Sequence, residues 1–393
     1  MTKPVVVKGS FFFVRRLQYQ GEIFILTLIP GSIILIIGAL LGWFVFAKIK
    51  FPTPQFMGPL FVVSCLNILN FPMPVLSPHI NQVAQIILGY FLGSAITPEY
   101  LKQMKQFFLP IVMTVVYSLL VTFGIGYVIY LALPLDIATG ILSAAPGGLP
   151  EVGVIALALQ AEIPTITLIH IVRIFVVIAF IPLVIKVGGL GSSAITAKNN
   201  PKTKVKEHER ISLKELAAIE VQKYRNRFHK VTSWLLHWTP VIAVSGGFIF
   251  NALQIPAGFM LGGMLAVVAA SVKGLKVKPL PPELFSTALL IIGIVIGMQF
   301  TRETLVQLSD IYMHVVLINI IILISGIGLA YIMHRVTGWK FLVCILASAP
   351  AAIFMMAAIA SETDSEPFKV SLLHIARLFT VKLTLPIIAL FLM

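Results

Sequence analysis

The sequence has few charged residues. Only 11% of its 393 residues are Asp, Glu, Lys or Arg, whereas 58% are hydrophobic. A soluble domain has about 25% charged residues, so this chain has too few polar side chains to cover a surface in water. The shortage excludes a soluble enzyme, a secreted disulfide-rich domain, a disordered chain and a coiled coil. It predicts an all-α polytopic membrane protein that lies in the cell membrane and is surrounded by the lipid bilayer.

Acidic residues and cysteines are scarce as well. Fifteen acidic residues stand against 29 basic ones, which gives a net charge of +14. The basic residues of a multi-pass membrane protein gather in its cytoplasmic loops, so the charge indicates topology and we expect no nucleic-acid partner. The two cysteines, Cys65 and Cys344, lie in apolar runs, which is typical of packing residues. We therefore expect neither a disulfide nor a metal site.

Apolar segments fill most of the chain. Six lie on each side of one polar stretch, at about residues 23–47, 55–70, 82–97, 107–133, 136–161 and 164–187, and then 232–253, 258–272, 285–300, 311–333, 339–361 and 367–392. The polar stretch holds ten basic and four acidic residues between 198 and 230. Its charge places it in the cytoplasm, either as a solvated loop or with an amphipathic helix on the membrane surface.

The two sets of segments are copies of each other. A shift of 204 residues aligns Gly89 with Gly293, Gly93 with Gly297, Pro146 with Pro350, His170 with His374, and Arg173 with Arg377, without a gap. Chance similarity in apolar composition would not align these residue types together. We predict a first membrane repeat at 1–187, a basic cytoplasmic linker at 188–230 and a second membrane repeat at 231–393. The paired glycines predict flat helix faces for close packing.

The fifth segment of each repeat is interrupted. In the first repeat, Pro146, Gly147 and Gly148 leave about 12 apolar residues on either side, whereas a membrane-spanning helix needs about 20. The segment is therefore a re-entrant hairpin or a crossing helix broken near its middle. A hairpin leaves five crossings per repeat and inverts the second repeat, whereas a crossing leaves six and keeps the repeats parallel. Outside the linker, the inverted arrangement places ten basic residues in the cytoplasm and five outside, whereas the parallel arrangement places nine and six. The count favours the inverted arrangement by a narrow margin, although the four basic residues at the N-terminus argue against it.

Interrupted helices at matching positions of two repeats point to the binding site of a transporter. Backbone groups freed by the break need protein, water or ligand as partners. The N-termini of the half-helices can therefore bind a carboxylate, and the freed carbonyl groups can bind a cation. The alternative is a kink that only fits helices together. The candidate residues for a substrate or ion site are Ser143, Pro146, Gly147, Gly148, Glu151, His170, Arg173, Ser348, Pro350, His374 and Arg377.

The charged candidates each have two interpretations. Arg173 and Arg377 either tie helices together through carbonyls and carboxylates or contact a substrate anion directly, because a basic residue deep in a bilayer needs a partner. Glu151 has Met355 at the matching position. It is therefore a charge at a helix N-terminus or the residue that carries a coupling proton or sodium ion.

The run Ala-Pro-Gly-Gly-Leu-Pro-Glu at 145–151 and the His-x-x-Arg pattern at 168–173, repeated at 372–377, resemble the membrane AbrB family. The resemblance implies kinship with cation antiporters and organic-anion carriers that have inverted repeats of about five helices. Members of the family have been labelled regulators of gene expression or ammonia monooxygenases. The eight histidines do not cluster as copper ligands would. In the second copy, Ala351 and Ala352 replace the glycines.

We interpret the chain as a secondary transporter of a small solute, such as an organic anion, and not as an enzyme. The sequence has no Walker loop, so transport would use a proton or sodium gradient or run as facilitated diffusion, and we expect no cofactor. A homo-oligomer is compatible with this interpretation. The alternative function is a membrane-bound regulator of gene expression that acts through the linker at 188–230.

Overall fold

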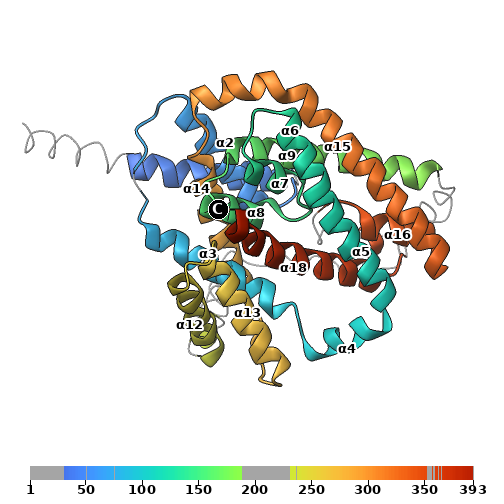
Figure 1. Ribbon diagram of the computed structural model, residues 1–393. Coiled ribbons are helices and arrows are strands. Elements are labelled where there is room, and N and C mark those ends of the chain that lie inside the picture. The colour runs from blue at the N-terminus through green and yellow to red at the C-terminus, as the bar shows by residue number, and fades with distance from the viewer. Residues whose placement is uncertain are drawn as a thin grey trace, which may run out of the picture.

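The computed structural model describes residues 31–49, 51–74, 76–187, 231–235, 237–351, 356, 359–361, 363 and 365–392. These residues form helices and connecting segments, with no strand among them (Figure 1). The predicted all-α fold is therefore confirmed for this part of the chain. The predictions for the linker at 188–230, and the positions of Ala352 and Met355, fall outside the described residues.

The first repeat begins with the helix Gly31–Lys48. It continues with α2 (Pro54–Ile68), α3 (Pro78–Ser94), α4 (Pro98–Gln106), α5 (Phe108–Leu120), the π-helix η1 (Val121–Ile125), α6 (Gly126–Ala132), α7 (Ile137–Ala144), α8 (Leu149–Ala158) and α9 (Ile163–Val187). The second repeat contains α12 (Trp238–Ala252), α13 (Gly258–Val272), α14 (Pro282–Gly297), α15 (Arg302–Thr337), α16 (Phe341–Ser348) and α18 (Pro367–Leu392). Several helices begin at a proline. Proline lacks an N–H, but the N–H groups of the first turn have no acceptor within the helix, so no hydrogen bond is lost there.

The repeated sequence gives repeated helices. The shift of 204 residues carries α2 onto α13 and α7 onto α16, and both ends of each pair coincide. The residues before α2 and α13, Thr53 and Ala257, both have a left-handed backbone, with φ of 47° and 55°. The duplication therefore extends from residue types to backbone conformation.

One difference between the repeats has a clear cause. In the first repeat, α4 ends at Gln106 and α5 begins at Phe108, whereas α15 continues over 36 residues. Pro110 has no N–H to donate to the carbonyl of Gln106, and its counterpart in α15 is His314. The sequence predicted separate segments at 285–300 and 311–333. The structure instead places the interruption between α14 and α15, where the chain turns by 83°.

The two repeats are interleaved. Helix α3 packs on α13 and α2 packs on α14, while α5 packs on α18 and α9 packs on α15, so each contact has a counterpart with the repeats exchanged. A Cβ atom at Gly89 would meet the carbonyl oxygen of Met260, and one at Gly293 would meet that of Phe56, which is the matching residue. The predicted flat glycine faces are thus confirmed, and they allow close helix packing across the two repeats.

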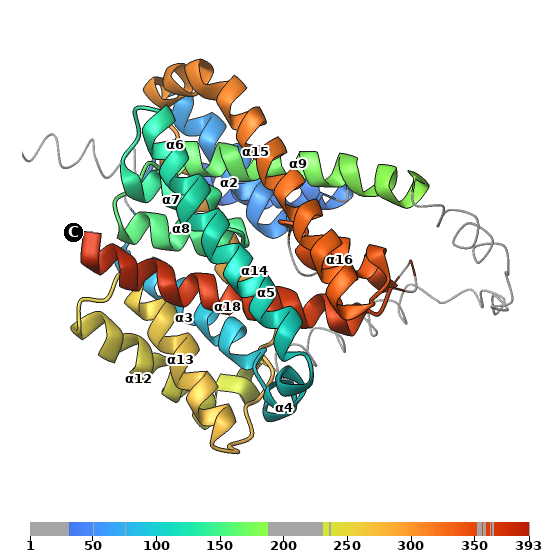
Figure 2. The same cartoon turned by 45° about the vertical axis from the view of Figure 1, so that its right-hand side comes forward.

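Matching helices of the two repeats run in opposite directions. Helix α9 runs from the centre toward the right of the molecule, whereas α18 runs from the right toward the C-terminus at the left (Figure 2). Helices α5 and α15 are also antiparallel in both views.

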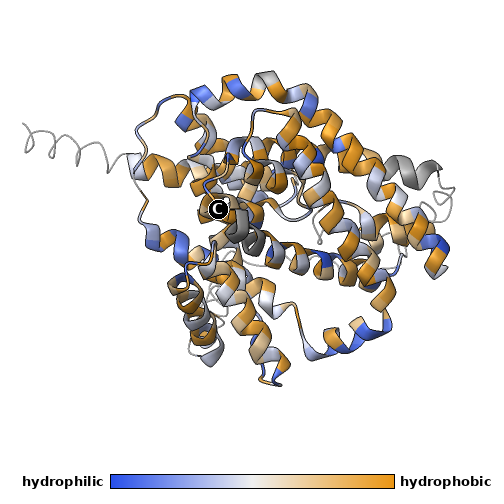
Figure 3. Ribbon diagram, viewed as in Figure 1, coloured by the Kyte–Doolittle hydropathy of each residue, from blue (hydrophilic) through white to orange (hydrophobic). Residues whose placement is uncertain are grey.

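Hydrophobic residues make up most of the helices, whereas α4 and the start of α15 carry hydrophilic ones (Figure 3). Ile37, Phe44, Val241 and Phe248 are examples of exposed large hydrophobic side chains. Three helices, Gly31–Lys48, Phe108–Ala132 and Ile311–Thr337, are long and apolar enough to cross a membrane, and two bent pairs raise this number to as many as five. These features fit a membrane protein. The choice between five and six crossings per repeat stays a prediction.

Candidate functional site

The first broken segment is made by α7 and α8. Helix α7 ends at Ala144, and α8 begins at Leu149 with Gly148 as an N-cap that has no side chain to accept from the helix. The two helices have 8 and 10 residues, shorter than the predicted 12 on either side. The last carbonyls of α7 and the first N–H groups of α8 lack intrahelical partners, so other groups have to satisfy them.

Arg173 on α9 satisfies carbonyls at the first break. Its Nη1 donates to the carbonyl of Ala145 at 2.8 Å, and its Nη2 donates to that of Ser143 at 2.5 Å. Its Nε donates to Oδ1 of Asn319 on α15 at 3.2 Å. The side chain is buried. Arg173 therefore ties the break to its own sixth helix and to a helix of the other repeat.

Arg377 on α18 occupies the matching place at the second break. Its Nη1 donates to the carbonyl of Ser348 at 3.2 Å, and its Nη2 to that of Ala349 at 3.0 Å. Nη2 also donates to Nδ1 of His374 at 2.7 Å. The proton on Nε2 of His374 is donated to the carbonyl of Leu346 at 2.9 Å, so this imidazole is neutral, with Nδ1 as an acceptor.

His170 is bonded differently from its counterpart. Its Nδ1 donates to the carbonyl of Ile166 on the same helix at 2.9 Å, since a carbonyl only accepts. Its buried Nε2 has no hydrogen-bond partner among the described residues, and the same is true of the hydroxyl of Ser143. The two histidines, aligned in sequence, therefore bond differently: His170 bonds within its own helix, and His374 bonds to the second broken segment.

A cavity of about 290 Å³ lies between the two breaks. It brings together six of the predicted site residues, namely Pro146, Gly147, Gly148, Glu151, His374 and Arg377. Ser143, His170 and Arg173 lie behind the first break and are not among its lining residues. Ser348 and Pro350 line a separate void of about 10 Å³ beside α9 and α15. Ala351 of the second break does reach the main cavity.

Other lining residues were not predicted from the sequence. The start of α2 contributes Thr53, Pro54 and Gln55, and Phe91 of α3 stacks on Phe285 of α14 with ring centroids 4.0 Å apart. Neither α2 nor α8 has a side-chain cap on its first N–H groups. The positive N-terminal ends of these two helices therefore face the cavity, an arrangement that favours an anion.

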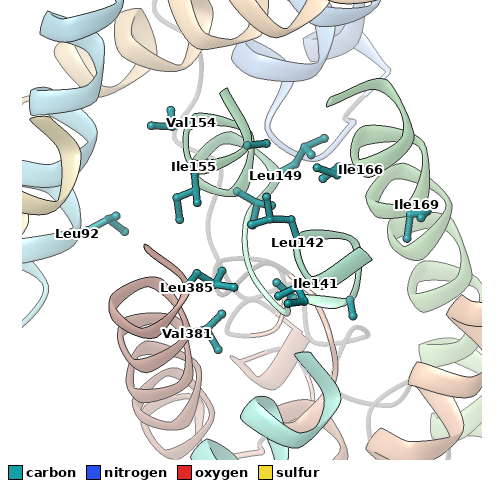
Figure 4. Close-up of a cluster of buried hydrophobic side chains, with 14 of the residues drawn as sticks. Leu92, Ile141, Leu142, Leu149, Val154, Ile155, Ile166, Ile169, Val381 and Leu385 are labelled. Carbon is teal, nitrogen blue, oxygen red and sulfur yellow. The ribbon is translucent and has the colours of Figure 1, made fainter. Parts of the chain in front are cut away.

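Lys382 on α18 is the largest omission from the sequence prediction. Its Nζ lies 3.4 Å from Oε1 of Glu151, and the two residues are 1% and 8% exposed. Lys382 corresponds to Ile178 under the shift of 204, so the signal that singled out Glu151, a charge in one copy only, also applies to Lys382. Next to Lys382 along α18, Val381 and Leu385 belong to the same buried hydrophobic cluster as Leu142 of α7 (Figure 4).

The comparisons with known proteins agree with this architecture. The family described as "Transition state regulatory protein AbrB" matches residues 10–188 and 209–393. The chain is 23% identical over 375 residues to "Uncharacterized protein YhjN" of Bacillus subtilis (strain 168), covering 91% of this chain and 88% of the relative. It is 29% identical over 153 residues to "Putative regulator AbrB" of Escherichia coli (strain K12), covering 39% and 44%. No solved structure matches. Because the family match extends over nearly the whole chain in two regions, the chain belongs to the AbrB family.

Proposed function

We propose that the protein is a secondary transporter of a small solute, and that the solute binds in the cavity between the two breaks. The observation that carries this proposal is that both interrupted segments, one from each repeat, line one cavity of about 290 Å³. The volume lies just below the range for small-molecule sites, about 300–1,000 Å³, which favours a small solute. Discontinuous helices around a central site are the usual construction of transporters with repeats.

The opposite directions of matching helices support an inverted pair of repeats, each with five crossings and one re-entrant segment. In that arrangement the two breaks enter from opposite sides of the membrane and meet near its middle. Rocking of one repeat against the other would then open the cavity to one side at a time. Helix α9 packs on α15 and α5 packs on α18 across the two repeats. Such movement would occur at these two helix interfaces.

The charges around the cavity favour an organic anion as the solute. The guanidinium of Arg377 and the N-terminal ends of α2 and α8 supply positive potential. Glu151 would oppose an anion, but Lys382 balances its charge. Phe91, Leu92, Phe285 and Leu289 supply an apolar wall for the carbon skeleton. Energy would come from a proton or sodium gradient, or the protein would run as a facilitator.

Purified protein tests the proposal directly. A thermal-shift screen against small organic acids, amino acids and sodium salts should give ligands that raise the melting temperature, because binding to the native state stabilises it by mass action. Each ligand found is then tested for uptake into proteoliposomes. Substituting Gly147 and Gly148 together with leucine should fill the cavity and stop uptake. Gly124→Leu is the matched control, since a Cβ there meets no atom within 4 Å. Normal uptake by the double variant would reject the cavity as the site.

The second candidate function is a membrane-bound regulator. It is favoured by the name of the relative in Escherichia coli, "Putative regulator AbrB", and by the ten basic residues between 198 and 230. Replacing residues 198–225 with a neutral Gly-Ser linker of equal length separates the two functions. A transporter keeps its uptake after this replacement, whereas a regulator loses its effect on gene expression and shows no uptake before or after.

A further inference from the structure

The ion pair between Glu151 and Lys382 joins the two repeats at a position that the duplication does not explain. Glu151 belongs to α8 of the first repeat and Lys382 to α18 of the second, and their counterparts are Met355 and Ile178. A single buried charge costs several kcal/mol, and a buried partner of opposite charge recovers part of that cost. Because the repeated sequence has no charge at the matching positions, we expect Glu151 and Lys382 to act together in function.

The geometry of the pair is not that of a saturated structural ion pair. A strong buried pair has N–O distances of about 2.7–2.9 Å and all its polar atoms bonded. Here the distance is 3.4 Å, and within the described part of the chain neither Nζ of Lys382 nor Oε2 of Glu151 has a hydrogen-bond partner. One carboxylate oxygen thus has no bond to give up when a cation binds, and the existing contact with Lys382 is longer than that of a strong pair.

The cavity reaches one partner of the pair. Glu151 is part of the cavity wall, whereas Lys382 is not among the lining residues. Gly148 provides the space for this carboxylate, because a Cβ at that position would lie 3.0 Å from Cδ of Glu151. A small cation that enters the cavity therefore meets the carboxylate without having to pass Lys382.

The other charged groups around Glu151 are already engaged. Helix α7 has no titratable residue, and Glu283, the one titratable residue of α14, is not part of the cavity wall. On α9, Arg173 donates to the first break and His170 to Ile166, while on α18 Arg377 and His374 bond to each other and to the second break. Glu151 is thus the residue of this group that can exchange one cationic partner for another.

We infer that Glu151 is a binding site for a small monovalent cation, a proton or a sodium ion, and that Lys382 is an internal competitor that occupies the carboxylate when the cation is absent. Binding of the cation neutralises Glu151 and leaves the charge of Lys382 unbalanced. The potential in the cavity then becomes more positive, so an anionic solute binds more tightly. This last step rests on the proposed function and would couple the anion to the cation gradient; the cation site itself does not depend on it.

Equilibrium binding tests the inference without measuring transport. The full-length protein in detergent is melted over a range of sodium chloride against choline chloride at fixed pH, and over a range of pH in choline chloride. The arm in which the melting temperature rises with cation concentration identifies the ion. Glu151→Gln should abolish that rise. Lys382→Ile, which introduces the residue of the first repeat, should lower the half-saturating cation concentration about tenfold, because the competing charge is gone.

Two further variants keep the result interpretable. The double variant Glu151→Met with Lys382→Ile carries the residues of the opposite repeat at both positions and removes both charges of the pair together, so it should fold and show no cation response. Lys369→Met removes the lysine of another ion pair, with Glu366, and should respond like the wild type. An unchanged half-saturating concentration in Lys382→Ile, a full response in Glu151→Gln, or no response of the wild type to either cation would overturn the inference. Absence of uptake together with the expected binding results would reject only the transporter.

Discussion

The two broken segments are stabilised in the same way by an arginine, but different residues surround them. In both, an arginine of the sixth helix donates to carbonyls freed by the break, Arg173 to Ala145 and Arg377 to Ala349. Arg173 also links the first break to Asn319 of the other repeat. The second break has no such link from the matching position, because the counterpart of Asn319 is Val115, whose side chain has no acceptor. The repeated residues therefore maintain the broken backbone, and the unmatched residues determine what each break can do.

The unmatched residues are not distributed at random. Gly148 and Glu151 at the first break and Lys382 opposite them all lack an equivalent in the other copy, and they are close together in the structure. Burial without matched partners costs free energy, so a purely architectural role would not require them in one copy only. The comparison points to the first break as the ion-binding one and to the second as the one that presents Arg377 to the cavity.

The strongest test of the comparison concerns the orientation of the repeats. Glu162 and Glu366 are matching residues before α9 and at the start of α18. We expect single cysteines at these positions, in a background without Cys65 and Cys344, to be labelled from opposite sides of the membrane, with Glu366→Cys reacting from the cytoplasm. Membrane-impermeant maleimides on whole cells and on inverted vesicles measure this. Labelling of both from one side would show parallel repeats with six crossings each.

Much of this arrangement could be predicted from the sequence. Prolines, glycines, histidines and arginines that recur at a fixed shift impose the same backbone twice, which is why the helix ends of α7 and α16 coincide. The hydrogen bonds from the arginines to the breaks could also be predicted, since a buried arginine needs acceptors and a broken helix leaves carbonyl groups without partners.

The remaining features depend on tertiary packing. Gln55 and Phe285 line the cavity because α2 packs on α14 across the repeats, and no local pattern specifies that contact. Lys382 was not predicted because it lies far from Glu151 in the sequence and away from the second break, and only the packing of the two repeats brings the two charges together. The interruption near Gln106 depends on Pro110, which was read as part of an apolar segment. An unmatched charge in a duplicated membrane protein is the signal to look for.

The second test compares the two arginines. Arg173→Gln and Arg377→Gln should each destabilise the protein by about 3 kcal/mol, because each leaves buried carbonyls without a donor. Arg377 lines the cavity and Arg173 does not, so at temperatures well below melting only Arg377→Gln should weaken solute binding. Melting curves and ligand titrations measure the two effects. The exposed Arg302→Gln is the control for loss of a positive charge. Equal loss of binding in both variants would mean that the arginines act through the fold alone.

The smallest expected difference separates two neighbouring glycines. A Cβ at Gly148 would collide with the carboxylate of Glu151, whereas a Cβ at Gly147 would lie 3.6 Å from Cγ2 of Val152, an ordinary contact. Gly148→Ala should therefore displace Glu151 from Lys382 and reduce cation-dependent uptake about tenfold, which corresponds to a loss of about 1.4 kcal/mol in cation binding. Gly147→Ala should stay within about twofold of the wild type. Uptake assays in proteoliposomes, with expression levels matched, measure the ratio. Combining Gly148→Ala with Glu151→Gln should add no further loss, since the collision acts through that carboxylate. An additive loss in the combined variant would show that Gly148 is required for the backbone of the break itself.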